Sequence, residues 1–436
     1  MTTLVDKCSV DTPFTTGRQH IKRHAKRRCY EVPSSNGFHE VIRPISSVRC
    51  KPEISSVTIS QQQPPNTPGH QAPARIADCL KPYVTADSQW WQWKYNSRIH
   101  YKQQGLSGPC ILLVHGFGVG AYHFDELILK LSATCQVWAV DLLGQGMSWP
   151  ETEPPEEARL RFSIETWTHQ LTDFVEQVIQ QPVYLAGNSL GGLLSAHLAA
   201  TQPNLCRGVI FLNATPFWSF MPHPETAPRL VTAVLPWNGT LPVPRLARFL
   251  VKNLWWSLLS RRRVVQSLVR NVYADKSAAD DALVDQILAS TQHPLALDAF
   301  VSILFAPQAR LSFDGMLASM QCPVCMIYGR EDPWVVPLWG QRLKRLLADA
   351  VYLEVSPAGH CPHHEAPTAV HEAMSKWVQS VEGGKPLPWA VGEQWKHQHL
   401  TVTHVDGSAR NVFEKADVLW YAIRKRFFRS ARAQKS

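Results

Sequence analysis

The sequence of 436 residues has no uninterrupted apolar run near the roughly 20 residues that cross a bilayer. It also has no compact apolar segment near its start of the kind that directs secretion. Its ten cysteines are scattered over the chain and lack the spacing of a small disulfide framework. We therefore expect a protein that neither spans a membrane nor is secreted, and that keeps free thiols in a reducing compartment.

Positive charge is scarce where a nucleic-acid-binding protein would need it. The net charge is +9, but residues 1–80 hold eleven Lys and Arg against six Asp and Glu, and residues 401–436 hold eight against three. Each end therefore carries +5 and the stretch between them −1. Because nucleic-acid binders place positive charge on the recognition surface, we predict no nucleic-acid partner for the folded part.

Composition divides the chain into four parts. Residues 1–50 are rich in Ser, Thr, Lys and Arg and poor in acids, which is typical of an organelle transit peptide. Residues 51–84 have too little apolar content to pack and are predicted to be a disordered linker. Residues 85–383 are long and apolar enough for one large domain, and residues 384–436 form a basic extension.

The folded part alternates strand patterns with helix patterns. It begins with two alternating segments, residues 90–93 and 99–101, which predict an antiparallel pair. Unalternated apolar runs, typical of strands covered on both faces, follow with helical stretches between them. They lie at residues 110–114, 137–140, 183–186, 208–212, 324–328 and 351–355. This order predicts an α/β fold with a mostly parallel, doubly wound sheet and a site at the carboxyl ends of its strands.

One stretch joins a strand, a sharp turn and a helix around a serine. The apolar run ends in Gly187-Asn188-Ser189-Leu190-Gly191, and a helical run over residues 190–200 begins at once. This pattern indicates a nucleophile elbow, in which glycines let backbone pass close by and the turn lifts the hydroxyl out of the sheet. Ser189 is thus a candidate nucleophile, although an ordinary N-cap serine also fits these five residues alone.

The alternation stops between residues 214 and 302, directly after the sixth predicted strand. This segment has amphipathic helical stretches interrupted by prolines, which predict a helical lid over the strand ends. Its aromatic residues form either the packed core of the lid or the wall of a large apolar pocket that faces Ser189. The pocket candidates are Phe217, Trp218, Trp237, Trp255 and Trp256.

A serine nucleophile needs a base, and the base needs an acid that orients it. Asp332 and His360 each follow a later predicted strand, at the edge of the sheet where Ser189 is expected. The order serine, acid, histidine is that of α/β hydrolases. We predict that His360 accepts the proton of Ser189, that Asp332 fixes the histidine tautomer, and that the backbone N–H groups of Phe117 and Leu190 bind the oxyanion.

Nearby residues leave other interpretations open. Asp141 also ends a strand, but it precedes the serine, which favours a structural role. Glu331 adjoins Asp332 and is the alternative acid. Four residues resemble metal ligands: His360, Cys361, His363 and His364. No second ligand cluster with regular spacing accompanies them, so we predict no metal site.

Six stretches make a combined pattern, at residues 116–120, 144–146, 187–192, 212–218, 328–334 and 356–363. Together they resemble the pheophytinases, a family of plastid α/β hydrolases of chlorophyll breakdown. The elbow and the first glycine loop are shared by many hydrolases, whereas the stretches at 212–218 and 356–363 are far more specific. The resemblance runs from about Trp90 to Gly384. His115 departs from the proline of the land-plant enzymes and leaves the predicted triad intact.

The resemblance implies that a phytylated porphyrin pigment, pheophytin, is hydrolysed at its phytyl ester to give pheophorbide and phytol. Ser189 would carry the pheophorbide acyl group and His360 would protonate the departing phytol, with no cofactor. A chloroplast location follows, in the stroma or at the thylakoid surface, as does contact with other enzymes of chlorophyll breakdown. The C-terminal segment ends in an amphipathic helix with a basic end, which either touches the thylakoid membrane or packs on the domain.

Three alternatives to this function stay open. One is a chlorophyll dephytylase, and another is a general lipid or carboxyl-ester hydrolase or acyltransferase. The third is a non-catalytic pigment-binding relative, against which the presence of Ser189, Asp332 and His360 argues. Dehalogenase and epoxide hydrolase chemistry is disfavoured, because it requires a carboxylate rather than a serine at the elbow.

Overall fold

The computed structural model describes residues 80–433 apart from gaps at 81–82, 86, 95, 152–161, 215–248, 251–255 and 305–308. The predicted transit peptide and nearly all of the predicted linker lie outside the described residues. So do four of the five aromatic pocket candidates, which are Phe217, Trp218, Trp237 and Trp255. Within the described part, no helix has both the length and the apolar character needed to cross a bilayer.

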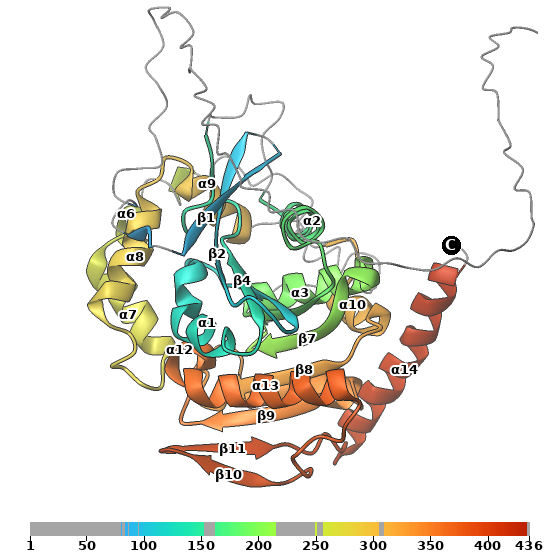
Figure 1. Ribbon diagram of the computed structural model, residues 1–436. Coiled ribbons are helices and arrows are strands. Elements are labelled where there is room, and N and C mark those ends of the chain that lie inside the picture. The colour runs from blue at the N-terminus through green and yellow to red at the C-terminus, as the bar shows by residue number, and fades with distance from the viewer. Residues whose placement is uncertain are drawn as a thin grey trace, which may run out of the picture. The chain divides into compact units, whose positions relative to one another are not determined.

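A sheet of eleven strands forms the centre of the described region (Figure 1). Its middle strands are parallel and lie in the order β4-β3-β6-β7-β8-β9, which is a doubly wound order, as predicted. Their bounds are β3 Cys110–Val114, β4 Gln136–Val140, β6 Val183–Asn188, β7 Cys206–Leu212, β8 Val324–Gly329 and β9 Val351–Ser356. Every residue of β3, β6 and β8 is buried, which explains why their sequences do not alternate.

Antiparallel strands extend the sheet at both edges. At one edge lie β2 (Ser97–Gln104), β1 (Ser88–Trp93) and the two-residue β5 (Trp149–Pro150), and the pairing of β1 with β2 confirms the predicted opening pair. At the other edge β11 (Leu400–His404) pairs with β9, and β10 (Gln394–His397) pairs with β11. The sheet therefore continues past residue 383, where the sequence predicts only a basic extension with a helix.

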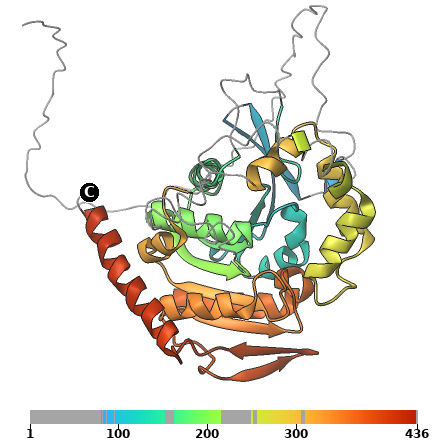
Figure 2. The same cartoon turned by 180° about the vertical axis from the view of Figure 1, so that it is seen from behind.

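Helices cover both faces of this sheet (Figures 1 and 2). Successive residues of a strand point to opposite faces, so Ile111 and Leu113 pack under one helix layer while Leu112 and Val114 pack under the other. The first layer holds α1 (Asp125–Leu131) and α13 (Pro367–Gly383). The second holds α2 (Ile164–Phe174) with its π-helical extension Val175–Ile179, α3 (Leu190–Thr201), α10 (Phe313–Ser319) and α11 (Pro337–Leu346).

Four of the helices that the structure describes between β7 and β8 stand beside the strand ends, and we call them the lid helices. They are α6 (Trp256–Leu259), α7 (Arg262–Val272), α8 (Asp281–Thr291) and α9 (Ala296–Leu304), drawn in yellow tones in Figure 1. Because β5 is an extra two-residue strand, β7 is the sixth of the predicted strands. The short elements η2 (Ala121–Phe124), η5 (Pro203–Leu205) and α12 (Pro362–Glu365) and the long helix α14 (Val412–Ala433) complete the described fold.

Candidate active site

Ser189 occupies the sharp turn between β6 and α3. Its backbone has φ 52° and ψ −117°, a left-handed conformation that is rare for a residue with a side chain. A Cβ atom on Gly191 would lie 2.0 Å from the carbonyl oxygen of Val114, and one on Gly187 would lie 2.2 Å from the carbonyl oxygen of Gly191. Only glycine fits at these two positions, so the predicted elbow geometry is confirmed.

His360 and Asp332 meet at the ends of β9 and β8. The distance from His360 Nδ1 to Asp332 Oδ2 is 2.6 Å, and the Asp332 side chain is completely buried. Its other oxygen, Oδ1, accepts the backbone N–H groups of Trp334 (2.7 Å) and Val335 (3.0 Å). Burial acts to raise the pKa of Asp332, but the hydrogen bond and charge of His360 and these N–H groups outweigh it. The pKa therefore lies below its ordinary value of 3.8, and Asp332 is a carboxylate.

The hydrogen bonds of the described residues include none from the Ser189 hydroxyl, and Ser189 itself is only partly buried. Its neighbour Asn188 links the elbow to the histidine loop instead. Asn188 Nδ2 donates to the carbonyl oxygens of Leu212 (2.9 Å) and His360 (3.0 Å). The strand end that carries the serine is thus joined directly to the backbone of the predicted base.

A second asparagine, Asn213, supports the acid. Its Nδ2 donates to Asp332 Oδ2 at 2.8 Å, while its Oδ1 accepts the N–H of Gly329 at 2.8 Å. Asn213 is fully buried at the end of β7 and has φ 45°, a conformation that asparagine tolerates better than most residues. Sequence analysis missed both asparagines as site residues; their only local signal is a polar amide directly next to a buried strand end.

The two alternative carboxylates have other partners. Glu331 accepts hydrogen bonds from Ser356 Oγ (2.6 Å) and the N–H of Ala358 (2.8 Å), so it holds the loop before the histidine. Asp141 pairs with His100 Nδ1 at 2.9 Å and accepts the N–H of Met147 at 2.7 Å. Asp141 therefore has the structural role that the sequence indicated, and the partner of His360 is Asp332.

The first glycine loop lies against the elbow. A Cβ atom on Gly116 would come within 3.2 Å of Ser189 Cβ. His115 fixes this loop, because its Nε2 accepts the N–H of Leu142 (2.9 Å) and its Nδ1 therefore donates to the carbonyl oxygen of Gly116 (2.7 Å). Burial lowers the pKa of His115, which favours this neutral tautomer.

The two predicted oxyanion donors stand on either side of the serine. Leu190 is the first residue of α3, so its N–H belongs to the first turn, whose amides have no partner within the helix. Phe117 lies between Gly116 and Gly118, and the N–H of Gly118 donates to Gln145 Oε1 at 2.8 Å. The structure thus brings both backbone segments to the elbow, where the helix N-terminus also favours negative charge.

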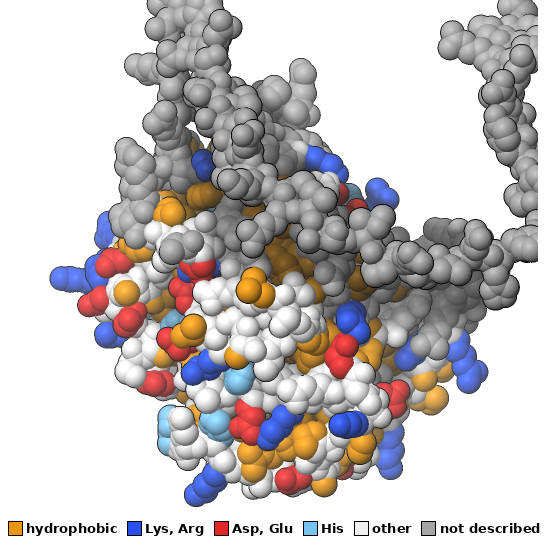
Figure 3. Space-filling model, viewed as in Figure 1, with side chains coloured by type: hydrophobic (Ala, Val, Ile, Leu, Met, Phe, Trp, Pro, Cys, Tyr) orange, Lys and Arg blue, Asp and Glu red, His pale blue; other side chains and the backbone are white. Residues whose placement is uncertain are grey.

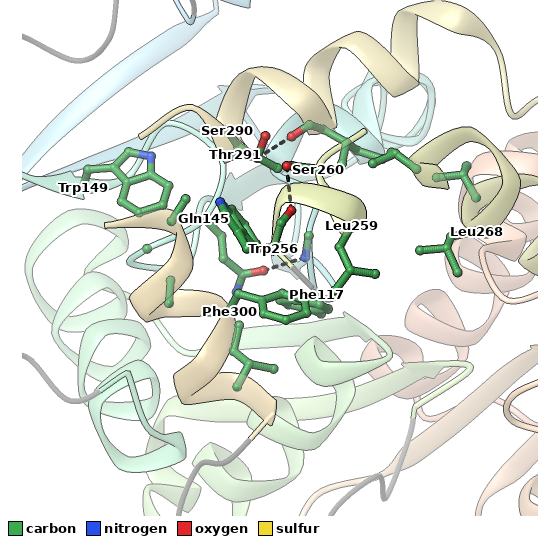
Figure 4. Close-up of a pocket in the computed structure, with 18 residues that line it drawn as sticks. Phe117, Gln145, Trp149, Trp256, Leu259, Ser260, Leu268, Ser290, Thr291 and Phe300 are labelled. Atoms are coloured by element: carbon green, nitrogen blue, oxygen red, sulfur yellow. Dashed lines mark hydrogen bonds between the residues drawn. The ribbon is translucent and has the colours of Figure 1, made fainter. Parts of the chain in front are cut away.

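A cavity of about 190 Å³ lies between the glycine loops and the lid helices (Figure 4). Its wall is mainly apolar and includes Trp256, the one pocket candidate among the described residues. Aromatic rings from both sides meet in it, with centroids 5.6 Å apart for Phe117 and Phe300 and 5.3 Å apart for Trp256 and Phe300. At about 190 Å³, the cavity is smaller than the roughly 300–1,000 Å³ of typical small-molecule sites.

The lid helices are bonded to the histidine loop. The N–H of His360 donates to the carbonyl oxygen of Val272, the last residue of α7, at 2.8 Å. Glu365 joins the same two segments, since Oε2 accepts the N–H groups of Ala274 (2.7 Å) and Asp275 (3.0 Å) and Oε1 accepts that of Gly359 (2.9 Å). Burial raises the pKa of the Glu365 carboxyl group.

A buried cluster of histidines lies behind the histidine loop. His123 Nε2 is 2.7 Å from the Tyr273 hydroxyl, and His123 Nδ1 is 3.1 Å from His363 Nε2. The His123 and His364 rings stack with centroids 4.6 Å apart. Burial lowers the pKa of His123 and His363 well below 6.5. Among the described residues no group of three or more His, Cys, Asp or Glu is placed to hold a metal ion.

The strand order, the elbow and the strand-end histidine–aspartate pair are those of one class of proteins. The sequence pattern of the alpha/beta hydrolase family matches residues 111–373, and the chain belongs to this family. A solved structure titled as a putative aryl esterase from Burkholderia cenocepacia superposes with a TM-score of 0.53 over 68% of this chain and 99% of that one. The two are 17% identical, so this likeness shows the fold alone.

The relatives narrow the family further. "Pheophytinase, chloroplastic" of Arabidopsis thaliana is 37% identical over 343 residues, which are 71% of this chain and 70% of that protein. A pimeloyl-[acyl-carrier protein] methyl ester esterase of Neisseria meningitidis is 27% identical over 283 residues, 64% of this chain and 80% of that protein. The resemblance to the pheophytinases is therefore confirmed, and these findings support hydrolase activity.

Proposed function

We propose that this protein is a serine esterase that hydrolyses the phytyl ester of pheophytin to pheophorbide and phytol. The observation that carries this proposal is the 37% identity to a pheophytinase over 343 residues. The site supports it, because it has an elbow serine and a histidine–carboxylate pair at 2.6 Å. A mainly apolar cavity borders the glycine loop of Phe117 and Gly118, although Ser189, Asp332 and His360 are not among the residues that line it. An apolar wall suits a hydrocarbon alcohol and a flat pigment, neither of which is well solvated by water.

In the proposed reaction, the Ser189 hydroxyl attacks the ester carbonyl. His360 holds Nδ1–H against Asp332, so Nε2 is the nitrogen that accepts the serine proton. The N–H groups of Phe117 and Leu190 stabilise the oxyanion of the tetrahedral intermediate. Phytol leaves with the proton from His360, and the pheophorbide acyl group stays on Ser189. Water then attacks this acyl ester and gives a proton to His360. His360 passes this proton to the Ser189 oxygen as the acyl–oxygen bond breaks, which releases pheophorbide and restores the serine.

The finer features of place and partners belong to the same proposal. The relative is named chloroplastic, which supports a chloroplast location for this chain as well. A pigment substrate of low water solubility favours work at the thylakoid surface over the open stroma. Contact with other enzymes of chlorophyll breakdown stays a prediction.

The first test compares Ser189→Ala with the wild type on pheophytin a, by measuring released phytol. We expect activity to fall by at least about a thousandfold, because removal of the nucleophile of a triad costs several orders of magnitude. Ser195→Ala is the matched control: it lies on the same helix and its hydroxyl only donates to the carbonyl oxygen of Gly191 (2.8 Å). Unchanged phytol release by Ser189→Ala would contradict the proposed mechanism.

A second test addresses the substrate. Wild-type turnover is compared on pheophytin, chlorophyll, an acylglycerol and a short soluble ester. We expect pheophytin to give the highest kcat/KM. If the acylglycerol is turned over fastest and Ser189→Ala abolishes that turnover, the proposed mechanism stands and the proposed substrate is wrong.

A further inference from the structure

Helix α14 lies against the domain through its charged side. Arg342 of α11 donates to both oxygens of Asp417, from Nε at 2.8 Å and from Nη2 at 3.1 Å. Arg345 of the same helix lies 3.6 Å from Glu414. The Tyr421 ring is buried in the core that α10 and α11 also line. Both acids of α14 are therefore used to dock the helix on the domain.

The apolar side of α14 faces solvent instead. The exposed fractions are 78% for Val412, 87% for Phe413, 63% for Leu419, 61% for Trp420 and 41% for Ile423. These positions recur at three- and four-residue spacing, so they form one stripe along the helix, which we call the outer stripe. A helix on a globular domain normally buries such a stripe. The helix does pack on the domain, but through the opposite face from the one that its pattern favours.

Helix α14 is basic in composition. Residues 412–433 contain six Lys and Arg and two Asp and Glu, and both acids face the arginines of α11. Lys415 is exposed, and Figure 3 shows hydrophobic and basic side chains next to one another along the edge that α14 forms. Two copies that met through this face would bring like charges together, whereas an anionic surface would be attracted. Phe, Leu and Trp beside Lys and Arg are typical of helices that lie in a membrane interface.

The position of α14 decides what such contact would do. The helix packs on α10 and α11, and both ribbon views show it at the opposite end of the strands from the lid helices α6, α7 and α8 (Figures 1 and 2). Contact through the outer stripe would therefore leave α6, α7 and α8 free of the membrane.

We propose that α14 is a tether: its outer stripe enters the interfacial layer of a bilayer that contains anionic lipid, while the lid helices α6, α7 and α8 lie at the far end of the domain from that surface. The helix lies along the bilayer and does not cross it. This inference does not rest on the proposed reaction, because it follows from the side on which α14 docks.

The test is flotation of the full chain with vesicles of phosphatidylcholine alone or of phosphatidylcholine and phosphatidylglycerol in equal parts. We expect the wild type to float with the anionic vesicles, to stay behind with the neutral ones, and to detach at high salt. Phe413→Ser combined with Trp420→Ser should bind the anionic vesicles at least about tenfold more weakly, because it removes the two largest side chains of the stripe. Lys415→Glu, which leaves the stripe intact, should weaken binding in the same direction.

Leu129→Ser is the matched control, since Leu129 is 62% exposed on α1, away from this face, and should float like the wild type. Turnover of a short soluble ester should be the same for all variants, which shows that they are folded and separates this test from that of the proposed reaction. Equal flotation of the double variant and the wild type would overturn the proposal. The proposal would also be overturned if the wild type bound neutral and anionic vesicles equally or floated with neither. A dimer in solution that the double variant abolishes would overturn it as well.

Discussion

Asn213 Nδ2 and His360 Nδ1 donate to the same oxygen of Asp332, Oδ2, at 2.8 and 2.6 Å. The amide of Asn213 is itself oriented by the N–H of Gly329, which its Oδ1 accepts. The carboxylate that faces the histidine thus has two donors on one oxygen and two backbone N–H groups on the other. This arrangement leaves Asp332 no freedom to turn away from His360.

The first prediction concerns Asn213 as a positioning residue. Asn213→Gly keeps the left-handed backbone available and removes the donor, so we expect kcat on a soluble ester to fall about tenfold with KM nearly unchanged. In Asn213→Asp, the protonated acid can replace the donor but the ionised acid repels Asp332. Its activity relative to the wild type should therefore fall as the pH rises. If Asn213→Asp loses the same fraction of the wild-type activity at every pH, the role of Asn213 is merely structural.

The second prediction concerns His115. His115→Ala leaves the buried N–H of Leu142 and the carbonyl oxygen of Gly116 without their partner. We expect the free energy of unfolding to drop by about 1–3 kcal/mol. We also expect kcat to fall, because the loop that carries the N–H of Phe117 loses its anchor. Urea unfolding and soluble-ester kinetics measure the two effects. If His115→Ala is less stable but keeps the full kcat, the anchoring of this loop does not affect catalysis, and the expected fall in kcat is wrong.

The third prediction concerns Glu365, which joins the lid to the histidine loop. In Glu365→Gln, one accepting oxygen becomes an NH₂ group that faces backbone donors. We expect about 1–3 kcal/mol lower stability and faster proteolysis of the segment after α7, because three charge-assisted hydrogen bonds are weakened. Glu126→Gln on α1 is a control on an exposed helix position. Identical proteolysis of the two variants would show that Glu365 does not hold the lid.

The fourth prediction concerns pH and His363. Because its folded pKa lies well below 6.5, protons bind the unfolded chain more readily, so its contribution to stability is full above pH 6.5 and is lost as the pH falls. His363→Phe packs beside Phe124, whose ring centroid is 4.5 Å from that of His363, and removes this titration. The variant should be less stable than the wild type at neutral pH, and the gap in Tm should narrow on acidification. A gap of constant size would contradict the assignment.

The parts of the site that could be predicted are those with a local pattern. Ser189 lies in a glycine-framed turn between a strand and a helix, and Asp332 and His360 each follow an apolar run, so sequence order was enough to pair them. The contacts of Asn213 with Asp332 join residues 119 positions apart and leave no periodic trace. Such contacts appear only when the strand order is known.

The C-terminal region shows a different limit. The three- and four-residue spacing in α14 predicts an apolar face but not whether that face turns inward, and the arginines of α11 decide the matter by pairing with Asp417 and Glu414. The hairpin of β10 and β11 is hard to predict because both strands are short and β10 has no buried residue. A polar edge strand of four residues looks like a loop.

The hydrogen bond from the His360 N–H to the carbonyl oxygen of Val272 joins the backbone of the catalytic base directly to the end of lid helix α7. A lid that swings far enough to admit a large pigment must break or carry this contact. Opening of the lid would then release the backbone of His360 from Val272. The enzyme would be active only after the lid has closed over the bound substrate. Small esters that enter without moving α7 would find His360 already held in place. A slow first turnover is therefore expected for large substrates only.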